Sequence, residues 1–349
     1  MPRRLAVALL AAAVSACGSQ PPSGPTTGPG VTDGPVGPTH TVRLVVFLDW
    51  DRNGAMSAPE LPLAGVEIAI GQKKATTDAN GRASIDGIGT GAFVVTVAPS
   101  TTLPFLTTLQ DVTVNVPLPV EQFVPVTYPI GNNTPGLYMA FGDSIAGGDF
   151  STDRSGYRAR LGRKLGDFYH QGIGVEYGGN GGGRTEVGVE LIEGSLRRVR
   201  PAFTLVAFGV NDWASGACKP ETCDAIPNLR QILRSVKGSN SLPVVATLTP
   251  SNTGFDSRAP VERNDWVKAM NVQIKAMAPQ EGALLVDVYS AFERTGSISR
   301  YMSDHVHPND AGYELIAQAY FDALTHVRGT GTASAAWAPM PKLFDRGHP

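Results

Sequence analysis

Histidine is scarce in this chain, and its positions narrow the choice of a catalytic base. Of six histidines, four lie in a Pro/Gly-rich segment, at the end of a predicted surface helix, past the last predicted helix or in the tail: His40, His170, His326 and His348. Elimination leaves His305 and His307. An aspartate three residues before a histidine can reach its Nδ1 within one turn, which leaves Nε2 free to take a proton from a hydroxyl. Asp304 and His307 have this spacing.

Polar residues also follow two predicted strands. The strand predicted at residues 137–141 leads into a Gly-Asp-Ser turn that ends at Ser144, and the strand predicted at 203–210 leads into Asn211. Open parallel sheets bind ligands at the carboxyl ends of their strands. Acyl transfer requires a nucleophilic hydroxyl, a base and a group that orients the base. Ser144, His307 and Asp304 are the residue types for these three roles, in that order. The sequence therefore predicts acyl-transfer chemistry.

Three sequence blocks in this order resemble the SGNH (GDSL-type) hydrolase family over residues 137–327. The blocks are Gly-Asp-Ser at 142–144, Gly-x-Asn-Asp at 209–212 and Asp-x-x-His-Pro at 304–308. The resemblance implies that Ser144 is the nucleophile and gives one oxyanion N–H, that Asn211 is a side-chain oxyanion donor, and that His307 is a base oriented by Asp304. No Gly-x-Ser-x-Gly pentapeptide is present, which argues against the ordinary α/β-hydrolase elbow.

The glycine block of the chain departs from the pattern Asn-x-Gly-x-x-Gly-x-Thr of that family. Residues 177–185 read Tyr-Gly-Gly-Asn-Gly-Gly-Gly-Arg-Thr. Alignment on Gly183 and Thr185 puts Asn180 where the oxyanion glycine is expected. Gly179 or Gly181 fits with a shift of one residue, and we prefer Gly179 as the third oxyanion donor.

Composition and loop chemistry bear on the substrate. A net charge of −2 gives no basic excess, so a nucleic-acid partner is not expected. Residues 147–154, 178–185 and 251–258 should border the site, and they are rich in Gly, Ser, Asn, Asp and Arg. Such loops favour short acyl esters of carbohydrates as substrates. No cofactor is expected for catalysis. Two other functions remain open: a lipid, lysophospholipid or thioester hydrolase, and a surface-binding protein on an inactive hydrolase scaffold.

Alternating strands and helices must position these residues. Strands are predicted at 137–141, 175–177, 203–210, 243–248 and 283–288, and helices near 156–169, 186–200, 225–237, 260–278 and 312–324. Such βα units predict a parallel sheet with helices on both sides, a three-layer αβα fold of the SGNH type. This hydrolase domain is predicted at 130–328, with a C-terminal tail at 329–349.

Residues 41–129 predict a separate small antiparallel β-sandwich, with strands at 41–48, 65–70, 92–97 and 112–116. Asp49, Asp51, Asn53 and Glu60 match the ligand positions of a Ca²⁺ loop. The alternative is a polar hairpin loop without metal. The stretch 46–97 resembles the Cna-B/Sdr B-like domains of bacterial surface proteins, which implies contact with a cell-surface glycan or protein.

The N-terminus predicts export. A charged start, a short apolar run and small residues before Cys17 resemble a lipoprotein signal peptide, so residues 1–16 would be removed and Cys17 lipidated. An ordinary secretory signal is the alternative. The Pro/Gly-rich residues 17–40 would form a tether from the membrane of a bacterial envelope, either outer membrane or cell surface. In an oxidising compartment, Cys218 and Cys223 are expected to form a disulfide rather than a zinc site.

Overall fold

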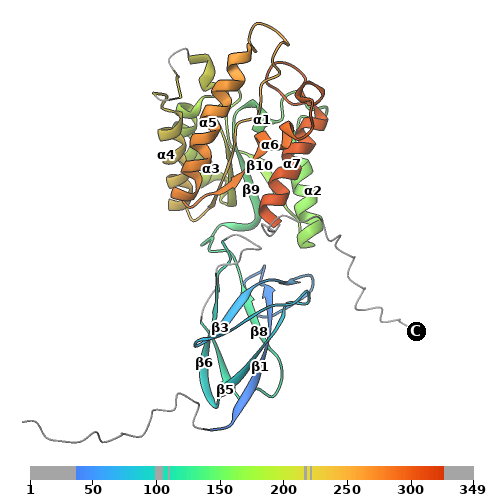
Figure 1. The fold of residues 1–349 in the computed structure, drawn as a ribbon, viewed down its shortest axis with the longest axis vertical. Coiled ribbons are helices and arrows are strands. Elements are labelled where there is room, and N and C mark those ends of the chain that lie inside the picture. The colour runs from blue at the N-terminus through green and yellow to red at the C-terminus, as the bar shows by residue number, and fades with distance from the viewer. Residues whose placement is uncertain (1–36, 99–104, 109–110, 216–217, 221, 326–349) are drawn as a thin grey trace, which may run out of the picture. The chain divides into compact units, whose positions relative to one another are not determined.

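The computed structural model describes residues 37–98, 105–108, 111–215, 218–220 and 222–325. The predicted signal peptide, Cys17, most of the tether and the tail at 329–349 lie outside these ranges. An all-β part comes first along the chain, and an α/β part follows it (Figure 1). Within the ranges given above, no helix combines the length and hydropathy needed to cross a membrane.

Two sheets make up the all-β part. The first contains β1 (Thr39–Leu48), β2 (Leu61–Pro62), β5 (Arg82–Gly89) and β8 (Gln122–Val126), and the second contains β3 (Glu67–Ile70), β4 (Lys73–Thr76), β6 (Gly91–Val97) and β7 (Val112–Val116). The second sheet is antiparallel throughout. In the first, β8 runs parallel to β1, so the prediction of a wholly antiparallel sandwich is wrong at this pair. The reason is that the chain crosses from β7 in one sheet to β8 in the other.

A five-stranded parallel sheet forms the centre of the α/β part, in the order β10-β9-β11-β12-β13. The strands are β9 (Thr134–Gly142), β10 (Gly174–Tyr177), β11 (Pro201–Ala207), β12 (Leu242–Ala246) and β13 (Leu284–Val286). Every residue of β12 and all but the last of β11 are buried. Burial on both faces explains why these strands read as continuous apolar runs.

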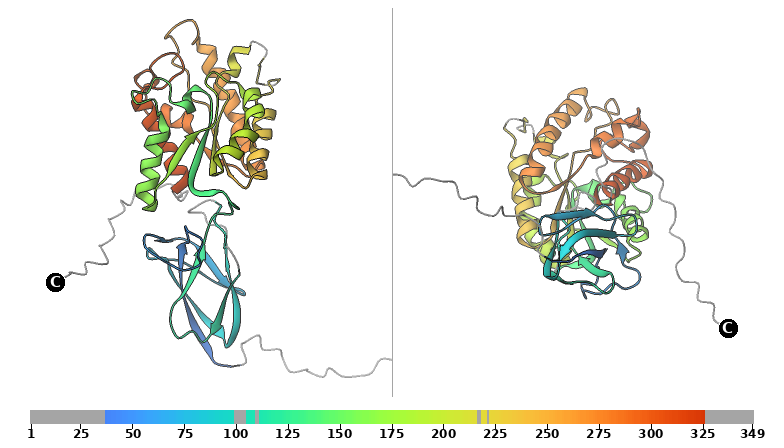
Figure 2. Two further views of the ribbon diagram at one scale, coloured as in Figure 1. Left: turned by 180° about the vertical axis from the view of Figure 1, so that it is seen from behind. Right: turned by 60° about the horizontal axis from the view of Figure 1, so that its bottom comes forward.

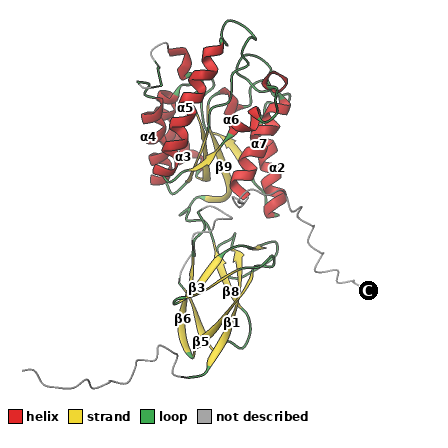
Figure 3. Ribbon diagram, viewed as in Figure 1, coloured by secondary structure: helices red, strands yellow, loops and turns green. Residues whose placement is uncertain are grey.

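Helices cover both faces of this sheet, as Figures 1 and 3 show and as the view from behind in Figure 2 repeats. One layer contains α2 (Tyr157–Tyr169) and α7 (Asp310–Thr325), with α6 (Val288–Glu293) packed against α7. The other contains α3 (Thr185–Val199), α4 (Ala225–Gly238) and α5 (Val261–Gln280). The fold is therefore the three-layer αβα arrangement that the sequence predicts.

Short elements at the ends of the strands were not predicted. They are α1 (Ser144–Gly147) after β9, the 3₁₀ turn η1 (Asp212–Ser215) after β11, and the 3₁₀ turn η2 (Ile298–Tyr301) before α7. The strand β11 ends at Ala207, earlier than the predicted residue 210. The chain therefore leaves the sheet before it reaches Asn211, and these short elements determine where the polar side chains point.

Candidate active site

The predicted catalytic residues come from three separate segments of the α/β part. Ser144 is the first residue of α1, directly after β9. Asn211 follows β11, which is the hydrogen-bonded neighbour of β9 in the sheet. Asp304 and His307 lie in the loop between η2 and α7. Parallel neighbouring strands bring their carboxyl ends to one edge of the sheet, so Ser144 and Asn211 share that edge.

A continuous hydrogen-bonded chain joins Ser144, His307 and Asp304. Oγ of Ser144 lies 2.9 Å from Nε2 of His307, and Nδ1 of His307 lies 2.8 Å from Oδ2 of Asp304. When Nδ1–H donates to the carboxylate, Nε2 is the acceptor for the serine hydroxyl. The geometry is that of a nucleophile, a base and an orienting acid.

The loop itself holds Asp304 in place. Its Oδ1 accepts hydrogen bonds from the backbone N–H of Val306 at 2.8 Å and of His307 at 2.7 Å. Burial alone would raise the pKa of Asp304, but the N–H groups of His307 and Val306 and the ring of His307 bring it below its usual range. The side chain therefore stays ionised and accepts from the imidazole.

Neighbouring side chains fix the turn that presents Ser144. The Asp143 carboxyl group caps α1 by accepting from the N–H of Ile145 at 3.0 Å. The Arg158 guanidinium donates to the carbonyls of Ala146 and Gly147 at the other end of α1. Because Ser144 is the first residue of a helix, its N–H has no partner within that helix. It is therefore available to a developing negative charge.

Asn211 and the glycine block are tied together. The Asn211 amide donates to the Gly183 carbonyl at 3.0 Å. The carboxylate of Asp212 accepts from the N–H of Thr185 at 3.1 Å and from its hydroxyl at 2.7 Å. Burial raises the pKa of Asp212, although the two hydrogen bonds from Thr185 oppose this. These contacts hold the start of α3 against the end of β11 and orient the Asn211 side chain.

The structure places Gly179 against β9, where no side chain fits. A Cβ at this position would lie 1.7 Å from the carbonyl oxygen of Gly142. The next residue, Asn180, donates its N–H to the same oxygen at 3.0 Å. Close packing is therefore one reason for glycine at 179, and the contact of Asn211 is with Gly183 instead. The role of Gly179 in the oxyanion hole stays a prediction.

Comparison with known proteins decides the family. A model of the GDSL-like lipase/acylhydrolase family matches residues 140–315, which is half of the chain and includes Ser144, Asn211, Asp304 and His307. The chain belongs to this family. It is therefore a serine ester hydrolase, as the predicted acyl-transfer chemistry requires. A search of curated proteins found no match.

Solved structures of similar fold each cover about half of the chain. A lipase/acylhydrolase from Enterococcus faecalis is 18% identical with a TM-score of 0.47, covering 54% of this chain and 95% of that one. An acetylxylan esterase from Geobacillus stearothermophilus is 20% identical with a TM-score of 0.46, covering 54% and 94%. An α/β hydrolase from the metagenome of Lake Arreo, Spain, is 20% identical with a TM-score of 0.43, covering 54% and 94%.

The two candidate histidines of the acylhydrolase differ in their contacts. Nδ1 of His305 lies 3.7 Å from Oδ2 of Asp304, too far for a hydrogen bond. Within the described part of the chain, this buried nitrogen has no hydrogen-bond partner. Burial lowers the pKa of His305 and so favours the neutral ring. Of the two, His307 is the one in contact with Ser144.

The cysteine pair shapes the loop after Asn211. A disulfide joins Cys218 to Cys223. The indole N–H of Trp266 in α5 donates to the Cys218 carbonyl at 2.8 Å. The Trp266 ring also packs edge-on against Trp213, which follows Asn211 closely in the chain. The loop is thus anchored to α5 at the disulfide.

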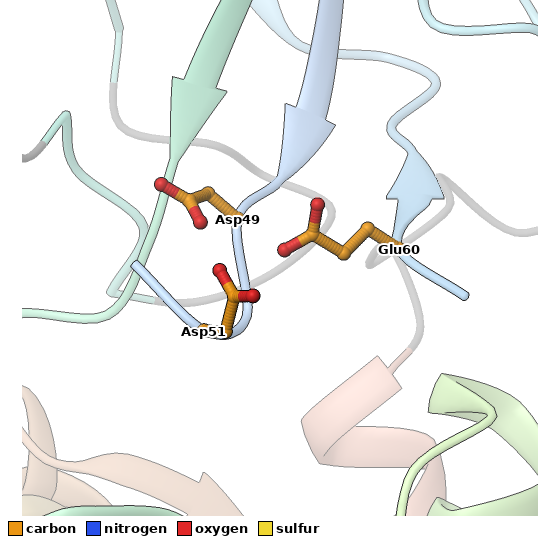
Figure 4. Close-up of side chains that lie close together, drawn as sticks. All are labelled: Asp49, Asp51 and Glu60. Atoms are coloured by element: carbon orange, nitrogen blue, oxygen red, sulfur yellow. The ribbon is translucent and has the colours of Figure 1, made fainter. Parts of the chain in front are cut away.

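Three of the four predicted Ca²⁺ ligands converge in the all-β part. Asp49, Asp51 and Glu60 offer oxygens within 4.8 Å of one another, and Figure 4 shows the three side chains lying close together. Asp49 and Glu60 are buried. Asn53 is arranged differently, because its Nδ2 donates to Asp51 and its Oδ1 accepts from the N–H of Ala55. Carboxylates of this kind suit a hard cation such as Ca²⁺.

Proposed function

We propose that the protein hydrolyses short acyl esters of carbohydrates through an acyl-enzyme on Ser144. The observation that carries the esterase chemistry is the hydrogen-bonded chain from Ser144 through His307 to Asp304, with distances of 2.9 and 2.8 Å. The preference for short acyl groups is supported by the polar loops of residues 147–154, 178–185 and 251–258. Long acyl chains need a continuous apolar wall that excludes water.

The reaction follows from the positions of these groups. His307 takes the Ser144 proton as Oγ attacks the ester carbonyl, and the resulting negative oxygen is stabilised by the Ser144 N–H and the Asn211 amide. One N–H of that amide donates to Gly183, and its second N–H is the one offered to the oxyanion. We include Gly179 as a third donor on the sequence pattern alone. His307 then protonates the leaving alcohol, and water releases the acyl group by the same steps.

The experiment compares kcat/KM for p-nitrophenyl acetate, butyrate, octanoate and palmitate. The proposal predicts a maximum at acetate or butyrate, and loss of all turnover in Ser144→Ala. A maximum at octanoate or longer would favour a lipid or lysophospholipid hydrolase. The absence of turnover with every ester would favour a surface-binding protein on a hydrolase scaffold.

We also propose that the acidic loop of the all-β part binds Ca²⁺. The convergence of Asp49, Asp51 and Glu60 supports this, because oxygens of three carboxylates within 4.8 Å of one another suit a hard cation. Calorimetry with Ca²⁺ at up to millimolar concentration should show binding that Asp49→Asn weakens, and Ca²⁺ should raise the melting temperature. Unchanged melting in Ca²⁺ and no binding heat would refute the site.

Export and anchoring through Cys17 stay proposals, supported by the pattern of residues 1–17. Palmitate labelling in a bacterial host should mark the wild-type chain and leave Cys17→Ser unlabelled. On detergent partitioning, the wild-type chain should enter the detergent phase, and Cys17→Ser should stay in the aqueous phase. A wild-type chain without label would favour an ordinary secretory signal.

A further inference from the structure

An exposed aromatic ring covers one face of the catalytic imidazole. The ring of Phe150 stacks on that of His307, with centroids 4.6 Å apart and an angle of 23° between the planes. Phe150 nevertheless keeps 57% of its surface exposed. The ring therefore packs on His307 while more than half of the surface of the residue stays open to solvent.

The backbone of Phe150 is held in a conformation that a side chain disfavours. Its φ is +65°, in the left-handed region that non-glycine residues rarely adopt. Hydrogen bonds on both sides impose this conformation. The Tyr313 hydroxyl donates to the Asp149 carbonyl at 2.6 Å, and the Ser151 hydroxyl donates to the Gly148 carbonyl at 2.8 Å. The surrounding loop therefore fixes the ring in its position over the imidazole.

Further contacts attach the same loop to the rest of the α/β part. Oγ of Ser151 accepts from the N–H of Gly156 at 2.9 Å, at the start of α2. The Thr152 N–H donates to the Asp310 carboxylate at 3.1 Å, at the start of α7. Anchoring to two helices means that the placement of the ring does not depend on contact with a substrate. The ring is therefore already in position before a substrate binds.

The chemistry of the site determines which half of a substrate meets this ring. During acylation the Ser144 Oγ–acyl carbon bond forms and the acyl carbon–alcohol oxygen bond breaks. The proton passes from Ser144 to Nε2 of His307 and from there to the alcohol oxygen. The leaving alcohol must therefore lie against the imidazole edge, beside the ring that stacks on it. The carbonyl oxygen of the acyl group points instead toward the oxyanion donors.

We propose that Phe150 selects the alcohol half of the ester by packing its exposed surface against a ring-shaped alcohol such as a sugar. The C–H face of a pyranose is apolar and matches an aromatic surface, whereas a methyl alcohol is too small to reach it. This proposal rests on the esterase function proposed above and gives it a specificity-determining residue. It concerns acylation, the step in which the alcohol is present.

The test compares two esters that share the acetyl group and differ in the alcohol, glucose pentaacetate and methyl acetate. Phe150→Ala should lower kcat/KM for glucose pentaacetate roughly tenfold more than it lowers kcat/KM for methyl acetate, the size expected for loss of one aromatic contact. Phe150→Tyr should retain the wild-type ratio of the two values. Phe123→Ala, which removes an exposed phenylalanine of β8 in the all-β part, should change neither ester.

Equal losses with both esters would show that the ring only positions His307, and would overturn the proposal. Unchanged values with both esters would overturn it as well. Thermal melting and labelling of Ser144 by a fluorophosphonate show whether Phe150→Ala keeps its fold and its nucleophile. A wild-type protein that hydrolyses neither ester and does not react with the fluorophosphonate would instead refute the proposed function itself.

Discussion

The carboxyl group of Asp143, next to the nucleophile, should make the stability of the protein fall as pH rises. Its side chain is fully buried, and only Oδ1 has a hydrogen-bond partner in the described part of the chain. Burial raises the pKa of Asp143 from 3.8 to about 7, although the N–H of Ile145 opposes this and the charge of Asp212 adds to it. At neutral pH the folded protein therefore binds this proton more tightly than the unfolded chain does.

The sign and size of the effect follow from linkage. The folded state gains stability from the bound proton below pH 3.8, and loses it progressively as pH rises through about 7. A difference of about three pH units corresponds to a loss of up to about 4 kcal/mol, with a slope of at most about 1.4 kcal/mol per pH unit. Asp143→Asn keeps the oxygen that caps α1 and does not titrate, so it should lack this fall.

The assay is the free energy of unfolding in urea, measured for wild type and Asp143→Asn at intervals from pH 4 to pH 8. Subtracting one curve from the other removes every other titrating group common to both. The advantage of the variant should grow with pH by one to several kcal/mol, most of it before about pH 7. Parallel curves, or an advantage that shrinks with rising pH, would refute the assignment of a raised pKa to this buried carboxyl.

Other predictions concern the catalytic groups and the disulfide loop. His307→Ala should lower kcat by about 10⁴-fold or more, whereas His305→Ala should retain most activity; the reverse pattern would contradict the choice of base. Asn211→Ala should lower kcat by about 10²–10³-fold with little change in KM, and an unaltered kcat would remove it from the oxyanion hole. Replacing Cys218 and Cys223 with serine should cost about 2 kcal/mol of stability, measured by urea unfolding, because a short loop is no longer closed in the unfolded chain. Two alkylatable thiols at these positions in protein purified without reductant would show that this bond does not form.

Local sequence patterns predict much of the α/β part because buried parallel strands read as short continuous apolar runs, whereas amphipathic helices repeat their apolar residues every three to four positions. The apolar run at 203–208 identifies β11, and the Asp-x-x-His spacing identifies the hydrogen bond between Asp304 and His307. Contacts between distant residues are not predictable in this way. The stacking of Phe150 on His307 depends on where two loops meet in space, and no local pattern indicates it.

In the all-β part, the sequence does not predict β2, β4, β5 and β8, and for two of these strands the reason is identifiable. β8 contains Pro125, a residue that argues against a strand unless the strand lies at a sheet edge or bulge. β5 contains Asp86 and Gly87, which resemble a turn signal in an otherwise alternating segment. The glycine at 179 is equally ambiguous in sequence, because the close packing against Gly142 accounts for it as well as a place in the oxyanion hole does.

The central claim is that Ser144 is the nucleophile of an esterase, and covalent labelling tests it most directly. The purified protein is treated with a fluorophosphonate, and the modified residue is located by peptide mass spectrometry. The hydrogen bond of 2.9 Å from Ser144 to His307 predicts one adduct, on Ser144, and none in His307→Ala on the same timescale. An adduct on another serine, or no adduct on the folded wild-type protein, would contradict the account.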